Sequence, residues 1–269
     1  MQIYKYMDIG SAKPTNDEMQ GIKHYMIDFV EPNERYSVAE YKKQAEECIE
    51  KVLEKGKTPI IVGGTGLYIN SLIYAIEYNE TKIDVKYREY LEKRVKTEGL
   101  SKLYDEACKI DKDAMKNISP NDKKRIIRVL EIYKETGKTK TELEKESRKE
   151  IKYNFKVFVT NMDREKLYER INKRVDIMIE QGLIEETKKI LEMYDEFPTA
   201  MQAIGYKEIK EYLDGKITKE EAIEKVKMES RRYAKRQLTW FRKNKNTTWL
   251  DMSIPVDENL DIIIQTILF

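Results

Sequence analysis

The sequence is poor in the residues from which metal sites and hydrolase triads are built. Its 269 residues include one histidine, His24, and two cysteines, Cys48 and Cys108. A structural zinc site uses about four Cys or His ligands at short paired spacings, which this chain does not contain. A Ser-His-Asp hydrolase would need His24 as its base, and no Gly-x-Ser-x-Gly elbow is present. We therefore expect neither kind of site, and we expect both cysteines to be reduced core residues.

The chain also lacks long hydrophobic runs and a strong charge of either sign. No apolar run approaches the roughly 20 residues that span a bilayer, and no signal peptide opens the chain. This favours a cytoplasmic protein without a membrane partner. The 51 basic and 49 acidic residues leave a net charge of only +2. That balance excludes a uniformly polybasic coat but leaves room for a local basic face.

The pattern of apolar residues, with few glycines and prolines, predicts an α/β fold that is rich in helices. Apolar residues make up 40% of the chain, enough for a sizeable core, and there are only 11 glycines and 6 prolines. Strand-like apolar stretches occur at 25–30, 58–62 and 155–159, and the second leads into a glycine turn, residues 63–66, that opens a helix. A strand, a glycine turn and a helix in this order predict a sheet with parallel strands.

The middle and the C-terminal part of the chain are predicted to be helical. Residues 84–152 follow a helical pattern with heavy charge, so we predict a helical insertion, residues 83–152, between core segments 1–82 and 153–269. Three or four further helices are expected after Asp163. Capping signals and breaker residues mark the helix ends. They are the capping boxes Ser37/Glu40 and Thr218/Glu221, an N-cap at Ser119 before Pro120, and breaks at Gly56, Gly99, Gly137, Gly182, Pro198 and Gly215.

The glycine turn is the first candidate site. Gly63, Gly64 and Gly66 surround Thr65 between the predicted strand and helix, so backbone amides can point toward an anion at the helix N-terminus. The turn is not a Walker A loop because no Lys-Ser or Lys-Thr follows, and it lacks the third glycine of Gly-x-Gly-x-x-Gly. The alternative is a tight turn whose glycines are needed only for positive φ.

A basic helix near the C-terminus is the second candidate. Residues 231–245 contain seven basic side chains and no acidic one, whereas the other predicted helices mix both signs. Gln237 and Trp240 lie among these cations, which suits phosphate contacts together with stacking or hydrogen bonding to an unpaired base. The alternative is a solvated face. The side chains that recur along one side at helical spacing are Arg232, Lys235, Arg236, Thr239, Arg242 and Lys243.

A third cation cluster lies in the predicted insertion. Lys124, Arg125 and Arg128 share one side of a helix, one turn apart. They are placed to clamp a phosphate. The alternative is a surface helix whose cations form salt bridges to Glu131 and Glu135.

Arg170 and Arg174 lie one turn apart beside the apolar stripe of the helix after Asp163. Such a pair can grip a diphosphate with forked hydrogen bonds. The alternative is pairing with glutamates of the same helix. Lys13, in a short loop, has the sequence context of an ordinary surface lysine unless the fold places it elsewhere.

Together these features resemble the tRNA dimethylallyltransferase (tRNA isopentenyltransferase) family along nearly the whole chain. The motifs that carry the resemblance are specific in their order, and they lie at 1–4, 7–14, 27–28, 36–39, 62–68, 121–122, 128–131, 203–206 and 235–242. The resemblance implies a P-loop-NTPase-like parallel-sheet core with an all-helical insertion domain and C-terminal helices. It also implies transfer of a dimethylallyl group from dimethylallyl diphosphate to the exocyclic amine of the adenine just 3′ of the anticodon in tRNA. Mg²⁺ is the implied cofactor, and a monomer is expected.

The resemblance also assigns roles to residues. Thr65 and Arg88 match catalytic positions that touch the tRNA substrate, and Gln2 matches the end of the family's Asp-Ser-x-Gln motif. Contacts to the anticodon stem-loop are implied for Gln2, Lys124, Arg125, Ile126, Ile127, Arg128, Gln202, Ala203, Ile204, Gly205, Tyr206, Lys207, Lys235, Arg236, Gln237, Thr239, Trp240 and Arg242. Binding of the diphosphate is assigned to Lys13, Gly63, Gly64, Gly66, Arg170 and Arg174.

One departure from the family pattern is large. The family's phosphate-binding loop and the Asp of Asp-Ser-x-Gln, the expected general base, would precede Met1, and no Walker A sequence occurs within the 269 residues. We therefore expect an N-terminally truncated core, low stability and little or no prenyl transfer by this chain. Two other functions stay open. One is a non-catalytic tRNA-binding remnant of the family, and the other is a small-molecule nucleotide kinase, which would have no use for the basic helix.

Overall fold

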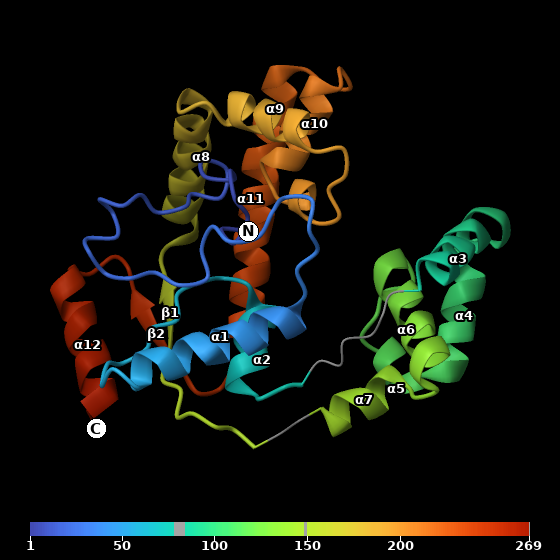
Figure 1. Cartoon of the computed structure of the whole chain (residues 1–269), viewed down its shortest axis with the longest axis horizontal. Helices are drawn as coiled ribbons and strands as arrows, with labels where there is room; N and C mark the ends of the chain where they lie inside the picture. The colour runs from blue at the N-terminus through green and yellow to red at the C-terminus, as the bar shows by residue number, and fades with distance from the viewer. Residues whose placement is uncertain (78–83, 148–149, 269) are drawn as a thin grey trace. The chain divides into compact units, whose positions relative to one another are not determined.

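The computed structural model describes most of the chain, in three stretches: residues 1–77, 84–147 and 150–268. The chain forms two compact units. The first consists of Met1–Ile69 together with Asn154–Phe269, and the second of Asn70–Tyr153; Figure 1 traces the elements of both. The predicted helical insertion, residues 83–152, overlaps the second unit, and its predicted start lies outside the described residues.

The first unit contains a two-stranded parallel sheet, β1 (Val157–Asn161) and β2 (Thr247–Asp251), which Figure 1 shows side by side. Val157 pairs with Thr247 at one end of the register, and Asn161 pairs with Asp251 at the other. β1 is shifted slightly beyond the predicted stretch 155–159, and the parallel direction agrees with the prediction. β2 is not predicted, because a short stretch with polar ends directly after a long helix has little alternation to detect.

The predicted buried strand at 58–62 does not form. This segment is irregular in the structure, and Ile60 is 84% and Val62 90% exposed. A strand needs a neighbour to satisfy its backbone N–H and C=O groups, and no strand in the part of the chain that the structure describes pairs with this segment. The apolar run therefore lies on the surface and leads into the glycine turn as irregular chain.

The predicted strand at 25–30 is also wrong. The backbone of Met26 and Asp28 is left-handed, with φ of 63° and 61°, and an extended strand cannot continue through residues in that region. What remains is a single parallel bridge between Tyr4 and Val30. The chain before the first helix is therefore built from turns.

Helices make up most of the first unit. The two predicted capping boxes are confirmed, Ser37 with Glu40 and Thr218 with Glu221. After Asp163 the described residues form five α-helices, where three or four were expected, because the last helix was not predicted. The helices are α1 (Val38–Leu53), α2 (Gly66–Ile73, which begins in this unit), α8 (Arg164–Glu180), α9 (Leu183–Met193), the 3-10 helix η1 (Ala200–Gln202), α10 (Tyr206–Leu213), α11 (Lys219–Phe241) and α12 (Val256–Leu268).

The N-terminal segment packs against α9 and α10. The Glu186 carboxylate on α9 accepts the backbone N–H groups of residues 8–10 at 2.8 to 3.1 Å and the Tyr206 hydroxyl at 2.5 Å. Burial and this carboxylate raise the pKa of Tyr206. A Cβ atom at Gly10 would lie 2.5 Å from the Tyr206 ring, so the loop and the helix pack closely. The buried core of this region comprises Tyr4, Met7, Val30, Leu183, Ile190, Ala200, Met201, Ala203, Tyr206, Ile209 and Ala222.

The regular elements in the described residues of the second unit are helices, joined by short turns. Its breaks at Gly99 and Gly137 agree with the prediction, and Gly137 has the left-handed φ of 67° that suits a helix C-cap. The predicted N-cap at Ser119 is wrong. The Asp122 side chain instead accepts the Arg125 N–H at 3.1 Å, because Asp caps as well as Ser and lies directly before the helix. The helices are α3 (Val85–Glu98), α4 (Leu100–Ile110), α5 (Lys112–Met115), α6 (Lys123–Thr136) and α7 (Lys140–Glu146). Their core comprises Leu91, Leu103, Ala107, Met115, Ile118, Ile126, Ile127, Val129 and Leu130.

The cysteines agree only in part with the sequence analysis, which expects both to be reduced core residues. Cys48 and Cys108 are free thiols at half-buried positions, and burial raises the pKa of Cys48. None of the helices in the described stretches is both long enough and apolar enough to cross a bilayer.

Candidate nucleic-acid interface

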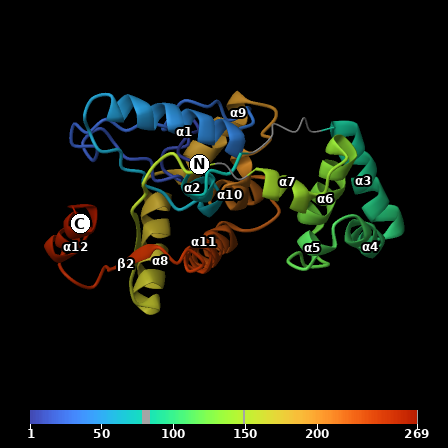
Figure 2. The ribbon, with the colours of Figure 1, turned by 90° about the horizontal axis from the view of Figure 1, so that it is seen from below.

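The glycine turn, residues 63–66, packs against the C-terminal half of α11. The Gln237 side-chain amide donates a hydrogen bond to the Gly64 carbonyl at 2.9 Å, and the Tyr233 hydroxyl donates to the same oxygen at 3.4 Å. The Thr65 carbonyl accepts the N–H groups of Tyr68 and Ile69 in the first turn of α2, at 2.9 and 3.1 Å. Figure 1 and Figure 2 both show the start of α2 beside the end of α11. Two of the predicted clusters therefore meet, although 173 positions separate Gly64 from Gln237.

Close packing explains two of the three glycines of this turn, Gly64 and Gly66. A Cβ atom at Gly66 would lie 2.5 Å from Cγ of the Trp240 ring, and one at Gly64 would lie 2.9 Å from Cδ of Gln237. Neither residue, nor Gly63, is among the glycines with left-handed φ. The tight-turn alternative, in which positive φ is the reason for glycine, is therefore wrong. Gly66 instead allows the indole of Trp240 to rest directly on the turn.

The last turns of α11 present cations to solvent. Lys235, Arg236 and Arg242 are exposed, and within the described ranges no ion pair joins them to a carboxylate. The Arg236 guanidinium lies over the Tyr233 ring, 5.7 Å from its centroid. Trp240 is 37% exposed, so its indole both rests on Gly66 and offers surface for stacking. A helix C-terminus also favours cations, because its carbonyl dipoles point outward there.

Arg170 and Arg174 lie exposed on α8, a helix that packs against α11. The Arg231 side chain on α11 donates to Asn172 on α8 at 2.5 Å, which joins the two helices. In the part of the chain that the structure covers, neither Arg170 nor Arg174 forms an ion pair with a glutamate of its own helix. No hydrogen bond there joins them to the glycine turn either. The assignment of this pair to a diphosphate therefore stays a prediction.

Lys13 is not the surface lysine that its sequence context indicates. Its side chain is only 7% exposed, and its ammonium group forms ion pairs with Asp8 and Asp28, each at 2.6 Å. It also donates to the Tyr4 carbonyl at 2.8 Å. Two carboxylates offset its charge, so this structure commits the ammonium to the N-terminal loop and not to an anion.

Several residues that the resemblance assigns to tRNA contacts are structural here. The Gln2 amide nitrogen donates to the carbonyls of residues 11 and 12 at 3.2 and 2.7 Å, and others are buried in the two cores. For the motif on α6 helical periodicity is the reason, because a continuous motif on a helix cannot present every side chain to one face; residues 203–205 instead connect η1 to α10 within the core of the first unit. The buried residues are Ile126, Ile127, Ala203, Gly205 and Tyr206. The exposed residues of the same stretches are Lys124, Arg125, Gln202 and Lys207, with Ile204 half-buried.

In the second unit, the buried Glu131 of α6 binds two arginines. Arg88 of α3 donates from Nε and Nη2 to the two carboxylate oxygens at 2.6 and 2.8 Å, and Arg128 donates to one of them at 3.4 Å. These bonds raise the pKa of Arg88. The salt-bridge alternative is thus right for Glu131, whereas Glu135 has no ion pair in the stretches described. Spacing on one helix reveals the Arg128 pair, but no sequence signal reveals Arg88 as the main partner.

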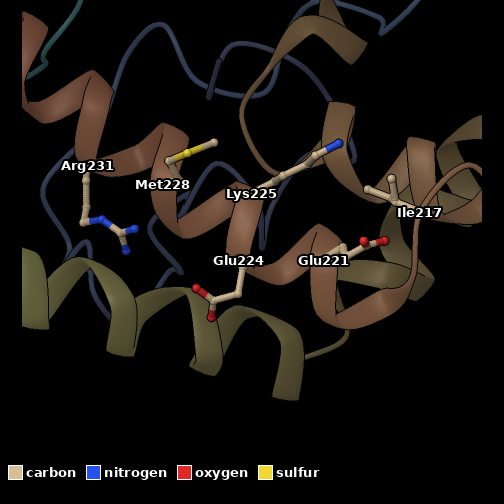
Figure 3. A pocket seen from close by; sticks show the side chains of 6 residues that line it. All are labelled: Ile217, Glu221, Glu224, Lys225, Met228 and Arg231. Atoms are coloured by element: carbon tan, nitrogen blue, oxygen red, sulfur yellow. The ribbon is translucent and has the colours of Figure 1, made fainter.

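Two surface depressions lie elsewhere in the first unit. One runs along the first half of α11 (Figure 3) and is lined by Ile217, Glu221, Glu224, Lys225, Met228 and Arg231. Its Lys225 is paired with Glu211 at 3.1 Å, so the charge is used within the protein. The other lies at the carboxyl ends of β1 and β2 and is lined by Asn161, Met162, Asp163, Lys166, Trp249, Leu250, Asp251 and Ser253. The sequence analysis missed it because β2 was not predicted.

Within the described chain no group of three or more His, Cys, Asp or Glu side chains is placed to hold a metal ion.

Known proteins are similar to this chain along most of its length. A family model described as IPP transferase matches residues 2–244. The tRNA dimethylallyltransferase of Acetivibrio thermocellus is 51% identical over 253 residues, which cover 93% of this chain and 81% of that protein. That of Caldanaerobacter subterraneus is 52% identical over 246 residues, covering 90% and 78%.

Solved structures give the same picture. The tRNA isopentenylpyrophosphate transferase of Bacillus halodurans matches with a TM-score of 0.72 at 44% identity, over 99% of this chain and 84% of that one. A eukaryotic dimethylallyltransferase acting on tRNA matches with a TM-score of 0.74 at 31% identity, over 93% of this chain and 65% of that one.

Proposed function

The chain belongs to the IPP transferase family, and from this premise we propose that it prenylates tRNA. The dimethylallyl group comes from dimethylallyl diphosphate, and the acceptor is the exocyclic amine of the adenine just 3′ of the anticodon. The observation that carries the proposal is the contact between the glycine turn and α11, where Gln237 and Trp240 lie beside exposed cations.

The reaction needs an unpaired base, a bound diphosphate and an acceptor for one proton. The amine nitrogen attacks the first allylic carbon, the carbon–oxygen bond to the diphosphate breaks, and its electron pair leaves with the diphosphate. The proton displaced from the amine passes to a base. Because the adenine lies in a loop, removing it from its stack costs roughly a few kcal/mol. The exposed indole of Trp240 suits stacking of such a base, and Lys235 and Arg242 suit the flanking phosphates.

The groups around the glycine turn are proposed to serve the leaving diphosphate. Thr65 and the amides of Gly63 to Gly66 supply hydrogen-bond donors, and Arg170 with Arg174 supplies forked donors. Such donors stabilise negative charge that develops on a leaving group. When bound, Mg²⁺ would add positive charge at the diphosphate. That ion usually needs only one or two carboxylates besides substrate phosphates, and the described residues hold no cluster of three or more candidate ligands, so we assign it no protein ligand.

Binding measurements test the tRNA part of this proposal. The purified chain is titrated with an unmodified tRNA transcript at several salt concentrations. We expect the affinity to fall steeply with salt, with a log–log slope of roughly 0.7 to 0.9 for each phosphate that the protein neutralises. Weak binding that salt does not change would contradict the proposal and favour the small-molecule kinase.

Mass analysis of the tRNA nucleosides tests the chemistry. After incubation with dimethylallyl diphosphate, transfer adds one five-carbon prenyl group to the anticodon-loop adenosine. We expect little product from these 269 residues, because neither of the two Gly-Lys-Thr sequences, at 56–58 and 137–139, has the glycine five positions earlier that a Walker A loop requires. Robust product would overturn the expectation of low turnover. Tight tRNA binding with no product at all would favour the non-catalytic tRNA-binding alternative.

A further inference from the structure

Glu131 lies where two arginine side chains from different helices converge. Its side chain is 6% exposed, whereas those of Arg88 and Arg128 are 36% and 35% exposed. Arg88 binds both carboxylate oxygens across the contact between α3 and α6, and Arg128 reaches one of them from the preceding turn of α6. The carboxylate is therefore the inner member of the cluster, and the two guanidinium groups are its solvent-facing members.

The charges of this cluster favour an anion on its outer side. Two guanidinium groups and one carboxylate leave a net charge of +1. Arg88 binds Glu131 through Nε and Nη2, so its Nη1 hydrogens are not used by that carboxylate. A guanidinium held in a fixed plane presents donors in the geometry that phosphate oxygens accept. Among the described residues, a second carboxylate that acts on Arg88 is Glu92, which is itself paired with Lys123 at 3.9 Å.

We propose that Glu131 is a positioning residue that orients Arg88 and Arg128 as a paired guanidinium site for a phosphate of tRNA. This inference rests on the proposed function. A mobile arginine loses rotamer entropy when it is ordered. Because Glu131 orders both arginines on folding, a phosphate that binds them meets side chains already in place.

Two features argue for this role over a purely structural bridge. A bridge that only joins α3 to α6 needs Arg88 alone, yet Arg128 is drawn to the same carboxylate. Lys124 and Arg125 are exposed on α6 before Arg128; Arg125 is paired with Asp122 at 3.3 Å, whereas Lys124 forms no ion pair within the described residues, so the cationic surface continues along the helix through Lys124. Both features place positive charge where an extended polyanion can follow it.

The test uses a substitution for which bulk electrostatics and positioning predict opposite changes in the affinity for tRNA. Glu131→Gln removes a negative charge, so bulk electrostatics alone would tighten tRNA binding. Loss of positioning weakens it instead, and we expect the Kd for an unmodified tRNA transcript to rise about tenfold. The log–log salt slope should fall by about 1. Glu135→Gln makes the same charge change at an exposed position one turn further along α6, and its Kd should stay unchanged or decrease slightly.

Folding of each variant is monitored by circular dichroism, and binding is measured below the melting transition. Should Glu131→Gln fail to fold, Arg88→Lys replaces it, because lysine keeps the charge but loses the fork, and we expect weaker binding at equal net charge. If the wild type binds tRNA and the Glu131→Gln and Glu135→Gln variants match in Kd and salt slope, the inference is overturned while the proposed function stands. If the Arg88→Lys variant binds tRNA as tightly as the wild type does, the inference is likewise overturned while the proposed function stands. A wild-type chain that does not bind tRNA overturns both.

Discussion

At the scale of single residues, the glycines of the turn are distinguished by what lies against them. Gly66 contacts the Trp240 ring and Gly64 contacts Gln237, whereas Gly63 has open space where a side chain would be. Motif patterning treats all three alike. The structure gives two of them a packing role, and that role connects the turn to the exposed indole proposed to stack on the tRNA base.

Gly66→Ala tests the packing role. The added methyl would lie 2.5 Å from Cγ of Trp240, and a rigid indole must shift as a whole to make room. We expect the free energy of unfolding to fall by about 1 to 3 kcal/mol, measured by urea titration. Gly63→Ala is the matched control, since its methyl enters open space, and it should change stability by less than about 0.5 kcal/mol. Equal stabilities of the two variants would contradict the packing explanation.

At the scale of elements, Asp111 joins the short helices of the second unit. It caps α5 by accepting the Ala114 N–H at 2.9 Å, and it accepts the Thr141 N–H and hydroxyl of α7 at 2.8 and 2.7 Å. Burial acts to raise the pKa of Asp111, but these hydrogen bonds outweigh it and the pKa is lowered on balance. The ionised carboxylate is therefore the form that holds the helices together.

Removing this carboxylate should destabilise the unit in a pH-dependent way. We expect Asp111→Ala to lower the free energy of unfolding by about 2 to 3 kcal/mol at pH 7. Because the folded pKa lies below the unfolded value of about 3.9, the contribution is complete above that pH and is lost as pH falls through the folded pKa. The difference in the free energy of unfolding between the variant and the wild type should thus narrow below about pH 4. Asp105→Ala, at an exposed position of α4, is the control. A gap of constant size down to pH 3 would count against this account.

At the scale of the whole molecule, a net charge of +2 conceals a strong local imbalance. Residues 231–245 carry seven basic side chains and no acidic one, and they comprise the end of α11, which packs on the glycine turn, and the four residues that follow it. The first turn of the same helix contains Glu220 and Glu221. One helix therefore has an acidic start and a cationic end, and only the cationic end adjoins the proposed base-stacking surface.

Charge reversal at the two ends of α11 tests that asymmetry. We expect Lys235→Glu to weaken tRNA binding roughly tenfold at low salt and to reduce the salt slope by about 1. Lys219→Glu makes the same change roughly 24 Å away along the helix axis. It should fold well, since a helix N-terminus favours acidic side chains, and it should bind nearly as the wild type does. Equal losses in titrations of both variants would mean that net charge, and not this surface, governs binding.

Most predictions that succeeded concern local interactions, although the local N-cap expected at Ser119 is taken by Asp122. The capping boxes at Ser37 and Thr218 and the break at Gly137 depend on residues within one helical turn, and the structure confirms all three. Other predictions failed where a distant partner decides. The segment 58–62 has the composition of a buried strand but finds no neighbouring strand in the described residues, and Lys13 is buried because two carboxylates surround it.

The order of motifs along the chain was by itself enough to identify the family and to single out the glycine turn and the basic helix. Only the tertiary structure decided that Gly64 and Gly66 leave room for the side chains of Gln237 and Trp240. It also decided that Arg88 of α3 binds Glu131 of α6. The physical reason is range. Helix caps and breaks are set by neighbours in sequence, whereas a packing contact or a buried ion pair depends on which remote segments the burial of apolar surface brings together.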